Sequence, residues 1–186
     1  MRVHASDRVL DRHKDGRGFF EELYSQARPE YDSDTSWRQV NHSVSRIHVL
    51  RGIHVAPYAK LVSCLIGHIY DVVVDTRPTS PTYGQWDAVD LCGDNGRQVY
   101  VPAGCGHAFV SLAEGSHVVY LQGGVYDPAR ELSLYWKSPA FDIMWPIESP
   151  MLSPKDSGAK LLQELPPPAK PWWKRWIAAI RSSSPS

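Results

Sequence analysis

The sequence predicts an all-β protein, a cupin-type antiparallel jelly roll with short peripheral helices. Between residues 40 and 145, the segments rich in Val, Ile and Tyr are about four to seven residues long, and no long segment has a 3.6-residue period. Turn clusters, PTSPTYG at 78–84 and GDNGR at 93–97, join consecutive segments. Regularly spaced short strands are typical of antiparallel sandwiches and barrels. The expected strands are 61–65, 69–75, 86–91, 98–101, 107–112, 117–122 and 132–136.

Two short helices and a separate tail are expected outside this region. Residues 21–28 are one candidate helix, and LSPKDSGAKLLQEL at 152–165 reads as a loop followed by another. PPPAKP at 166–171 then interrupts the chain, so we expect a jelly-roll domain over 1–165 and a Pro-rich hinge with a basic, aromatic tail over 166–186. In the tail, apolar residues at helical spacing predict either an amphipathic helix in weak contact with a membrane or a partner, or a frayed or self-packed end. These residues are Trp172, Trp173, Trp176, Ile177 and Ile180.

The composition limits the possible partners and compartments. The 186 residues suffice for one domain with a buried core, and the formal net charge of zero provides no field that draws the chain to nucleic acid or membrane. Cys64, Cys92 and Cys105 have no zinc-type spacing. The N-terminal segment lacks the apolar core of a secretory signal, and no run approaches the ~18 apolar residues of a membrane span. We expect a cytoplasmic protein with reduced thiols and no nucleic-acid partner.

One histidine and one lysine, His54 and Lys60, stand at the edges of strand-like segments that otherwise suggest burial. A neutral imidazole can accept a proton, and an ammonium group can stabilise an oxyanion. Together they suit the removal of a proton beside a carbonyl group. The alternative is a structural role, because a histidine on a strand is often a hydrogen-bonded core residue.

A metal site is not expected, although PAGCGHAF at 102–109 fits the second half of a cupin motif and would point His107 into the barrel. Metal-binding proteins of this fold typically have two further histidines and a glutamate in the first half of the cupin motif. Here His54 is present, but Ala56 takes the position of the second histidine and Lys60 stands near that of the glutamate. Two histidines beside a cation leave too few ligands for a stable metal site. We expect neither a metal nor another cofactor.

A series of short motifs spans about residues 15–156, and in their order and spacing the chain resembles the dTDP-4-dehydrorhamnose 3,5-epimerase (RmlC-like) family of nucleotide-sugar epimerases. The motifs are DGRGFFEELY, NHSVS, VLRGIH, KLV, DVVVDTRPTSPTYGQW, RQVYVPAGCGHAF, YW, WP and LSPKD. The resemblance implies a homodimeric, metal-free jelly roll that acts on a 4-keto-6-deoxy sugar linked to a nucleoside diphosphate. It places the chain in the biosynthesis of sugars for cell-surface polysaccharides.

The resemblance also implies roles for particular residues. His54 would be the base that removes the proton beside the ketone, with Asp156 as its carboxylate partner. Lys60 would stabilise the enolate oxygen, and Tyr120 would return a proton on the opposite face. His107 would be a second electrophilic or orienting group. The residues expected to contact nucleotide, diphosphate or sugar are Arg17, Glu22, Gln39, Asn41, Arg51 and Tyr126.

Several of these residues have structural alternatives. Asp156 could cap the helix expected after it, and Tyr120 could be a core tyrosine with a hydrogen-bonded hydroxyl. Arg17 and Glu22 could form a plain surface pair.

The chain also departs from typical members of the family. HVAPYAK at 54–60 is a short loop in which Val55 and Ala56 replace an aromatic residue and a glutamine, as in relatives that act on other nucleotide sugars, including GDP-linked heptoses. The nucleotide, the sugar length and the inversion of C3, C5 or both therefore stay open. The rival functions are a nucleotide-sugar 3,4-ketoisomerase, a non-catalytic sugar-nucleotide-binding jelly roll, and a metal-dependent cupin oxygenase.

Overall fold

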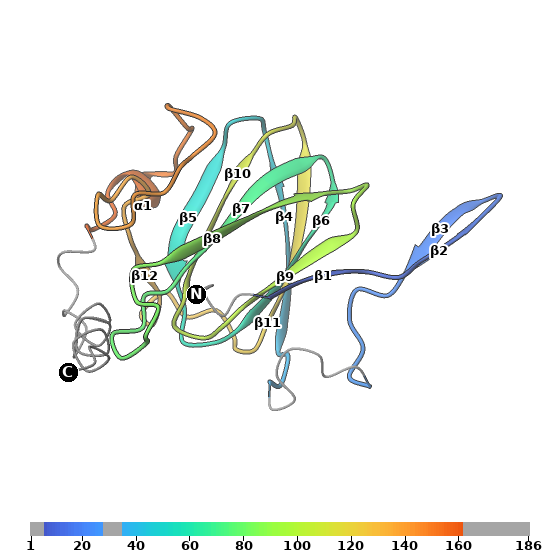
Figure 1. Cartoon of the computed structure of the whole chain (residues 1–186), viewed down its shortest axis with the longest axis horizontal. Helices are drawn as coiled ribbons and strands as arrows, with labels where there is room; N and C mark the ends of the chain where they lie inside the picture. Colours follow the sequence, from blue (N-terminus) through green and yellow to red (C-terminus); the bar gives the residue numbers. More distant parts are fainter. Residues whose placement is uncertain (1–5, 28–34, 162–186) are drawn as a thin grey trace, which may run out of the picture.

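A computed structural model describes residues 6–27 and 35–161, which form two five-stranded sheets and a two-stranded hairpin (Figure 1). The tail predicted over 166–186 lies outside the described residues. Within them, no helix is long and apolar enough to cross a membrane. The elements are β1 (Ser6–Val9), β2 (Arg12–Asp15), β3 (Gly18–Glu21), β4 (Gln39–Ser45), β5 (Leu50–Val55), β6 (Lys60–Ile66), β7 (His68–Val74), β8 (Trp86–Cys92), β9 (Arg97–Val101), β10 (Gly106–Ser111), β11 (Ser116–Gln122), β12 (Leu132–Ser133) and α1 (Pro154–Ser157).

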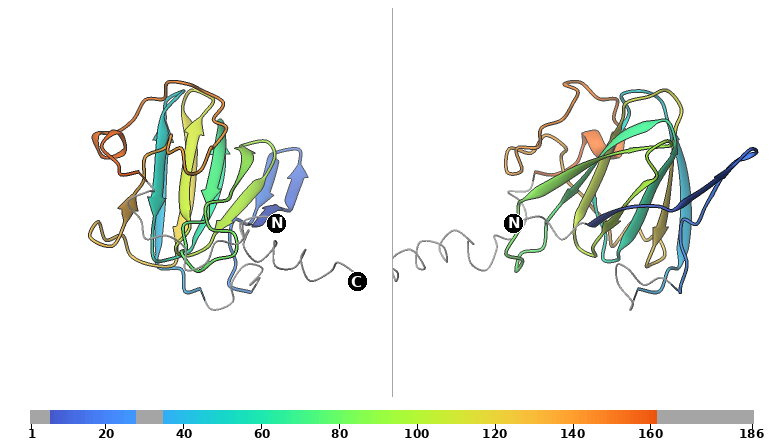
Figure 2. Two further views of the ribbon diagram at one scale, coloured as in Figure 1. Left: turned by 60° about the vertical axis from the view of Figure 1, so that its left-hand side comes forward. Right: turned by 45° about the vertical axis from the view of Figure 1, so that its right-hand side comes forward.

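In each of the two large sheets, neighbouring strands are antiparallel, and apart from β7 and β8 they are not consecutive in the sequence. One sheet has the order β1-β9-β6-β11-β4 and the other the order β12-β5-β10-β7-β8. Figure 2 shows the two sheets curving around a common interior, with the hairpin β2–β3 extending away from them. Consecutive strands such as β4 and β5 belong to opposite sheets, so residues that are close in sequence contribute to opposite walls. The predicted jelly roll is confirmed.

The interior is filled by β-branched and aromatic side chains that alternate along the strands. Val62 and Cys64 of β6 pack with Val99 of β9, Val118 of β11 and Phe109 of β10 in one buried cluster that joins the two sheets. On β4 the burial alternates residue by residue, because only one face of this strand turns inward. The core therefore holds both sheets in a fixed relation around the inward-facing polar residues described below.

Three predicted elements differ in the structure. The helix expected at 21–28 is wrong: Glu21 ends β3, and residues 22–27 form a loop with a turn. The segment 132–136 is a strand only over Leu132–Ser133. After Trp145 the structure has the helix α1 at Pro154–Ser157, in the part of 152–165 that was expected to be a loop, and residues 162–165 of the expected helix lie outside the described residues. The cap of α1 is Ser153, whose hydroxyl accepts a hydrogen bond from the Asp156 backbone, so the alternative of Asp156 as a helix cap is also wrong.

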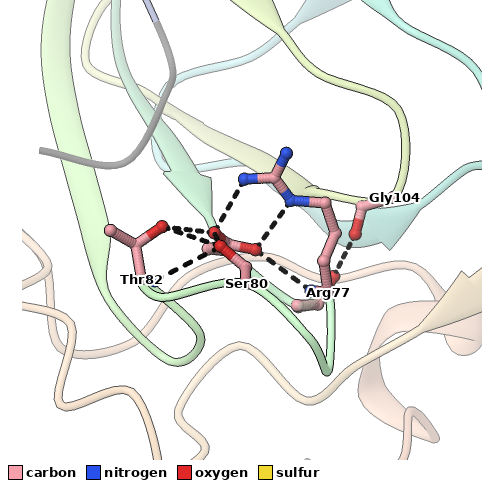
Figure 3. A network of polar contacts seen from close by, with 6 residues as sticks. Arg77, Ser80, Thr82 and Gly104 are labelled. Atoms are coloured by element: carbon pink, nitrogen blue, oxygen red, sulfur yellow. Dashed lines mark hydrogen bonds and ion pairs between the residues drawn. The ribbon is translucent and has the colours of Figure 1, made fainter. Parts of the chain in front are cut away.

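A buried carboxylate, Asp75, organises the turn between β7 and β8. Arg77 donates to both of its oxygens, at 2.9 and 2.8 Å, and the hydroxyls of Ser80 and Thr82 donate to Oδ2 (the three donor residues are labelled in Figure 3). In the same turn, the Thr76 hydroxyl donates to the backbone oxygen of Gly104, 2.6 Å away. Burial alone would raise the pKa of Asp75, but these hydrogen bonds outweigh it and lower the pKa to about 2.

Replacing Asp75 with Asn is expected to destabilise the fold by about 3 kcal/mol, because it removes one partner of a buried ion pair. Since the folded pKa of Asp75 lies below the 3.8 of an ordinary aspartate, its contribution to stability is present above pH ~4 and lost as the pH falls towards 2. Urea unfolding of both proteins at pH 7 and near pH 3 measures this. The exposed Asp94→Asn variant is the control, and equal stability of wild type and Asp75→Asn at pH 7 would contradict the expectation.

Candidate active site

A pocket of about 290 Å³ opens between the two sheets, and polar side chains line it from both walls. The wall formed by β5 and β10 contributes Arg51, His54, His107 and Phe109. The opposite wall, formed by β4, β6 and β11, contributes Asn41, Lys60, Tyr120 and Gln122. The loop after β11 and the segment around α1 complete the lining with Tyr126, Glu131, Ser153, Lys155 and Asp156.

His54 and Asp156 form a hydrogen-bonded pair at this pocket. The Nε2 atom of His54 lies 2.7 Å from Oδ1 of Asp156, although the two residues are 102 positions apart in the sequence. The His54 side chain is about a quarter exposed, at 27%, whereas that of Asp156 is 4% exposed. The carboxylate is therefore fixed from behind, while part of the imidazole remains accessible from the pocket.

Local structure holds Asp156 in this position. The Ser153 hydroxyl, which caps α1, also donates to Oδ2 of Asp156 at 2.9 Å. Burial alone would raise the pKa of Asp156, but the hydrogen bonds from His54, Ser153 and the Gly52 backbone lower it overall. Gly52 has a positive φ of 120°, and a Cβ at this position would lie 2.6 Å from the Ala108 side chain. Glycine thus allows β5 to lie close to β10 just before His54.

Lys60 lies at the start of β6 and is buried, with 6% of its surface exposed. Among residues 6–27 and 35–161, no hydrogen bond or ion pair holds its ammonium group, which faces the pocket. Burial lowers the pKa of Lys60, while the charges of Glu131 and Asp71 act in the opposite direction. An ammonium group without a protein partner in a partly desolvated pocket is suited to meet a negative oxygen of a ligand.

His107 also has a carboxylate partner. Its Nε2 atom lies 2.8 Å from Oδ2 of Asp71, and both side chains are buried. Oδ1 of Asp71 is buried without a hydrogen-bond partner among the described residues. Because β10 pairs with β7 on one side and with β5 on the other, His107 lies between Asp71 and the strand that carries His54. This pair fixes the orientation of His107 at the pocket wall.

The predicted substrate-binding residues fall into two groups. Asn41, Arg51 and Tyr126 line the pocket. Gln39 is next to it, where its amide donates to Asn41 and accepts a hydrogen bond from the Tyr126 backbone. The guanidinium of Arg51 is oriented by Ser45 and by the Val44 carbonyl, each at 3.0 Å.

Arg17 and Glu22 are not among the residues that line the pocket. Arg17 is in the turn of the hairpin β2–β3, which projects from the barrel (Figure 1), and Glu22 follows this hairpin directly. Both are exposed. Arg17 forms an ion pair with Asp15 at 2.6 Å, rather than the surface pair with Glu22 considered from the sequence.

Sequence reasoning missed several residues of the site. They are Asp71, Phe109, Gln122, Glu131, Ser153 and Lys155. Asp71 could have been suspected, because it is a single carboxylate within the apolar run IYDVVV. Glu131 accepts a hydrogen bond from the Tyr58 hydroxyl at 2.8 Å and lies 3.6 Å from the ammonium of Lys155. Glu131 comes from a loop and Lys155 from the short helix α1, and no periodicity points to their meeting.

The part of the chain that the structure describes contains no group of three or more His, Cys, Asp or Glu side chains that could hold a metal ion. His54 and His107 are on paired strands in register, but each has its own carboxylate partner. Ala56, at the position of the second cupin histidine, is buried and apolar.

Comparison with known proteins identifies the family. The family model described as dTDP-4-dehydrorhamnose 3,5-epimerase matches residues 8–164. The chain belongs to this family. The dTDP-4-dehydrorhamnose 3,5-epimerase of Salmonella typhimurium is 41% identical over 157 residues, which cover 81% of this chain and 86% of that protein. As the sequence predicted, the chain is thus a member of the RmlC-like epimerases, an isomerase family.

Solved structures agree with this assignment. The epimerase RmlC from Legionella pneumophila, in complex with dTDP-4-keto-L-rhamnose, superposes with a TM-score of 0.84 at 36% identity, over 90% of this chain and 94% of that one. A 3'-monoepimerase from Streptomyces bikiniensis, in complex with dTDP-quinovose, gives a TM-score of 0.82 at 35% identity, over 97% and 96% of the two chains. The family thus includes members described as inverting two centres and a member described as inverting one.

Proposed function

We propose that this epimerase inverts C3, C5 or both in a dTDP-linked 4-keto-6-deoxy sugar. The observation that carries this proposal is the placement of His54 and Tyr120 on opposite sheets, β5 and β11, of one pocket. A base on one face of a sugar ring and an acid on the other give inversion. The names of the relatives favour dTDP over GDP and a hexose over a heptose.

The reaction would proceed through an enolate. His54 removes the proton from the carbon beside the C4 ketone, and the negative charge moves to the ketone oxygen. The Asp156 carboxylate holds the ring of His54 and stabilises the imidazolium that forms. The Lys60 ammonium stabilises the enolate oxygen. The Tyr120 hydroxyl then donates a proton to the same carbon from the opposite face, and exchange with solvent restores both groups.

The remaining pocket residues would bind the rest of the substrate. The Arg51 guanidinium is held by Ser45 and Val44 and can offer two parallel N–H groups to a diphosphate. Asn41, Tyr126 and the Gln39 that connects them are placed to contact the nucleoside or sugar hydroxyls. His107, fixed by Asp71, would orient the ketone or donate to its oxygen.

Incubation with dTDP-4-keto-6-deoxyglucose in deuterated buffer, followed by NMR, tests the function. Deuterium at the carbons beside the ketone, with inverted configuration, is the expected result. A ketoisomerase would instead move the carbonyl, and a non-catalytic binding protein would leave the sugar unchanged. The buried, apolar Ala56 supports epimerisation over ketoisomerisation, because the ketoisomerases that this chain resembles usually have a second histidine at that position.

Replacing Lys60 with Met is expected to lower kcat by about 10²–10³-fold, as found when a donor to an oxyanion is removed. Activity of the wild type should also fall at alkaline pH. The pKa of Lys60 is lowered by burial, so the ammonium loses its proton at a lower pH than the 10.5 of an ordinary lysine, and the fall begins correspondingly earlier. A pH–rate profile with an unchanged alkaline limb in Lys60→Arg would contradict this assignment, because an arginine stays charged there.

We also propose that the protein is a homodimer. Phe19 and Phe20 of the hairpin β2–β3 are exposed, Phe20 by 68%, and Val40 on the edge strand β4 is exposed by 66%. An exposed edge strand and an apolar hairpin are sites where another chain can pair. In such a dimer the projecting hairpin would bring Arg17 and Glu22 towards the partner, which is how these residues could contribute to a substrate site.

Light scattering during gel filtration should give twice the 20.9 kDa mass of the chain. Replacing both Phe19 and Phe20 with Ser should shift the protein towards the monomer, since it removes apolar surface from the contact. Met144→Ser, at a side chain that is exposed in a different loop, is the control. A wild-type monomer at micromolar concentration would contradict the dimer.

The sequence expectation of a cytoplasmic enzyme stays part of the proposal. It is supported by the three free thiols of Cys64, Cys92 and Cys105, since reduced cysteines are usual in that compartment. The proposed contact of the tail with a membrane or partner would be tested by liposome cosedimentation of the full chain and of a chain that ends at residue 170.

A further inference from the structure

Gln122 is the one amide in the pocket wall that the mechanism above does not use. It is the last residue of β11, two positions after Tyr120, so both side chains point to the same face of the strand and both line the pocket. Its exposure is 3%. Within the described ranges, its Oε1 atom is buried and accepts no hydrogen bond.

The position of Gln122 relative to Lys60 is defined by the sheet. In the antiparallel pairing of β11 with β6, Gln122 and Lys60 are directly opposite partners. Residues in this relation have Cβ atoms about 5 Å apart on the same face. Gln122 and Lys60 therefore reach the pocket from neighbouring positions on the same wall, and the Lys60 ammonium group is the one that would hold the ketone oxygen of the substrate.

An amide without a protein partner in such a place is costly unless a ligand satisfies it. A buried polar group that lacks its hydrogen bond destabilises a fold, and an apolar residue at the same position would avoid this cost. Two other polar side chains of the pocket are bonded, Asn41 by Gln39 and Glu131 by Tyr58, whereas Lys60 and Gln122 both lack a protein partner among the described residues. A hydroxyl group suits the amide in either orientation, since it can both donate and accept.

We propose that Gln122 is a specificity-determining residue that hydrogen-bonds the hydroxyl on the carbon next to the ketone. The inference rests on the proposed function. In a 4-keto-6-deoxy sugar, only one neighbour of the ketone carbon, C3, carries a hydroxyl, whereas C5 carries the methyl group. With the ketone oxygen at Lys60, the hydroxyl of C3 is the sugar group that can reach the neighbouring Gln122. This contact would select which side of the ring faces β11.

The test compares two substrates in two proteins. The substrates are dTDP-4-keto-6-deoxyglucose and its 3-deoxy analogue, and the readout is kcat/KM for deuterium incorporation beside the ketone. Wild type should prefer the hydroxylated substrate, and Gln122→Met should lose about tenfold on that substrate while the analogue is turned over as before. Because both proteins are assayed with the same two substrates, differences in the intrinsic acidity of the substrates cancel when the proteins are compared. Gln85→Met, in the turn before β8, is the control for the substitution.

The outcomes separate the inference from the proposed function. Incorporation into neither substrate by wild type would refute the epimerase proposal itself. Equal losses on both substrates in Gln122→Met, or no loss on either, would overturn the role of Gln122 while leaving the epimerase intact. Gln122→Leu is the second variant, and because Oε1 has no protein partner, thermal unfolding of both variants should be unchanged or shifted upwards. A large fall in melting temperature would show that the residue is structural.

Discussion

Replacing His54 with Ala is expected to reduce deuterium incorporation beside the ketone by about 10³–10⁴-fold. A positioned base contributes about 10²–10⁴-fold to proton transfer, and the other imidazole of the same wall is less accessible. His107 is also paired with a carboxylate, Asp71, but its side chain is 8% exposed, against 27% for His54. NMR of the substrate in deuterated buffer measures the rate directly.

Two further variants make the His54 experiment specific. His68→Ala removes another imidazole paired with a carboxylate, Asp90, but outside the pocket, and should leave the rate unchanged. Asp156→Asn should retain the fold of the site but lower the rate, because an amide cannot stabilise the imidazolium and can hold the ring in the wrong tautomer. Wild-type rates of exchange in His54→Ala would exclude this residue as the base.

The strands β6–β12 could be predicted from the sequence, whereas β1–β5 were not predicted as strands. Short β-branched runs with turn residues between them have few alternatives to an antiparallel sandwich, and Lys60 and His107 lie on or beside such runs. His54 stands at the edge of such a segment, although its own strand, β5, was missed. Asp156 could be predicted only through the resemblance, because 102 residues separate it from His54.

The misjudged elements have physical reasons. The segment after Gly18 contains good helix formers, Glu21 and Glu22, but Arg12 binds both carboxylate oxygens of Glu21 across the hairpin, at 2.6 and 3.3 Å. Such a tertiary contact outweighs helix propensities of a few tenths of a kcal/mol per residue. Glu131 and Lys155 were missed because one lies in a loop and the other in a four-residue helix, and neither segment has a periodic pattern that points to the pocket.

Replacing Tyr120 with Phe is expected to separate proton removal from inversion. Because His54 and Tyr120 come from opposite sheets, the variant keeps the proposed base and loses only the proposed acid. His54 can then return a proton or deuteron to the face from which it took one. We expect deuterium incorporation to fall by less than about tenfold, while formation of the inverted sugar falls by about 10²–10³-fold.

The two rates can be read from one sample, since incorporation with retention and incorporation with inversion give different NMR signals. Tyr70→Phe is the matched control: this tyrosine packs against Trp145, away from the pocket, and loss of its hydroxyl should leave both rates unchanged. If Tyr120→Phe lowered both rates equally, its hydroxyl would act before the enolate forms, as an orienting group for the ketone. Inversion would then need another proton donor on the wall of β4, β6 and β11, and Lys60 is the remaining side chain there with a dissociable proton at the pocket.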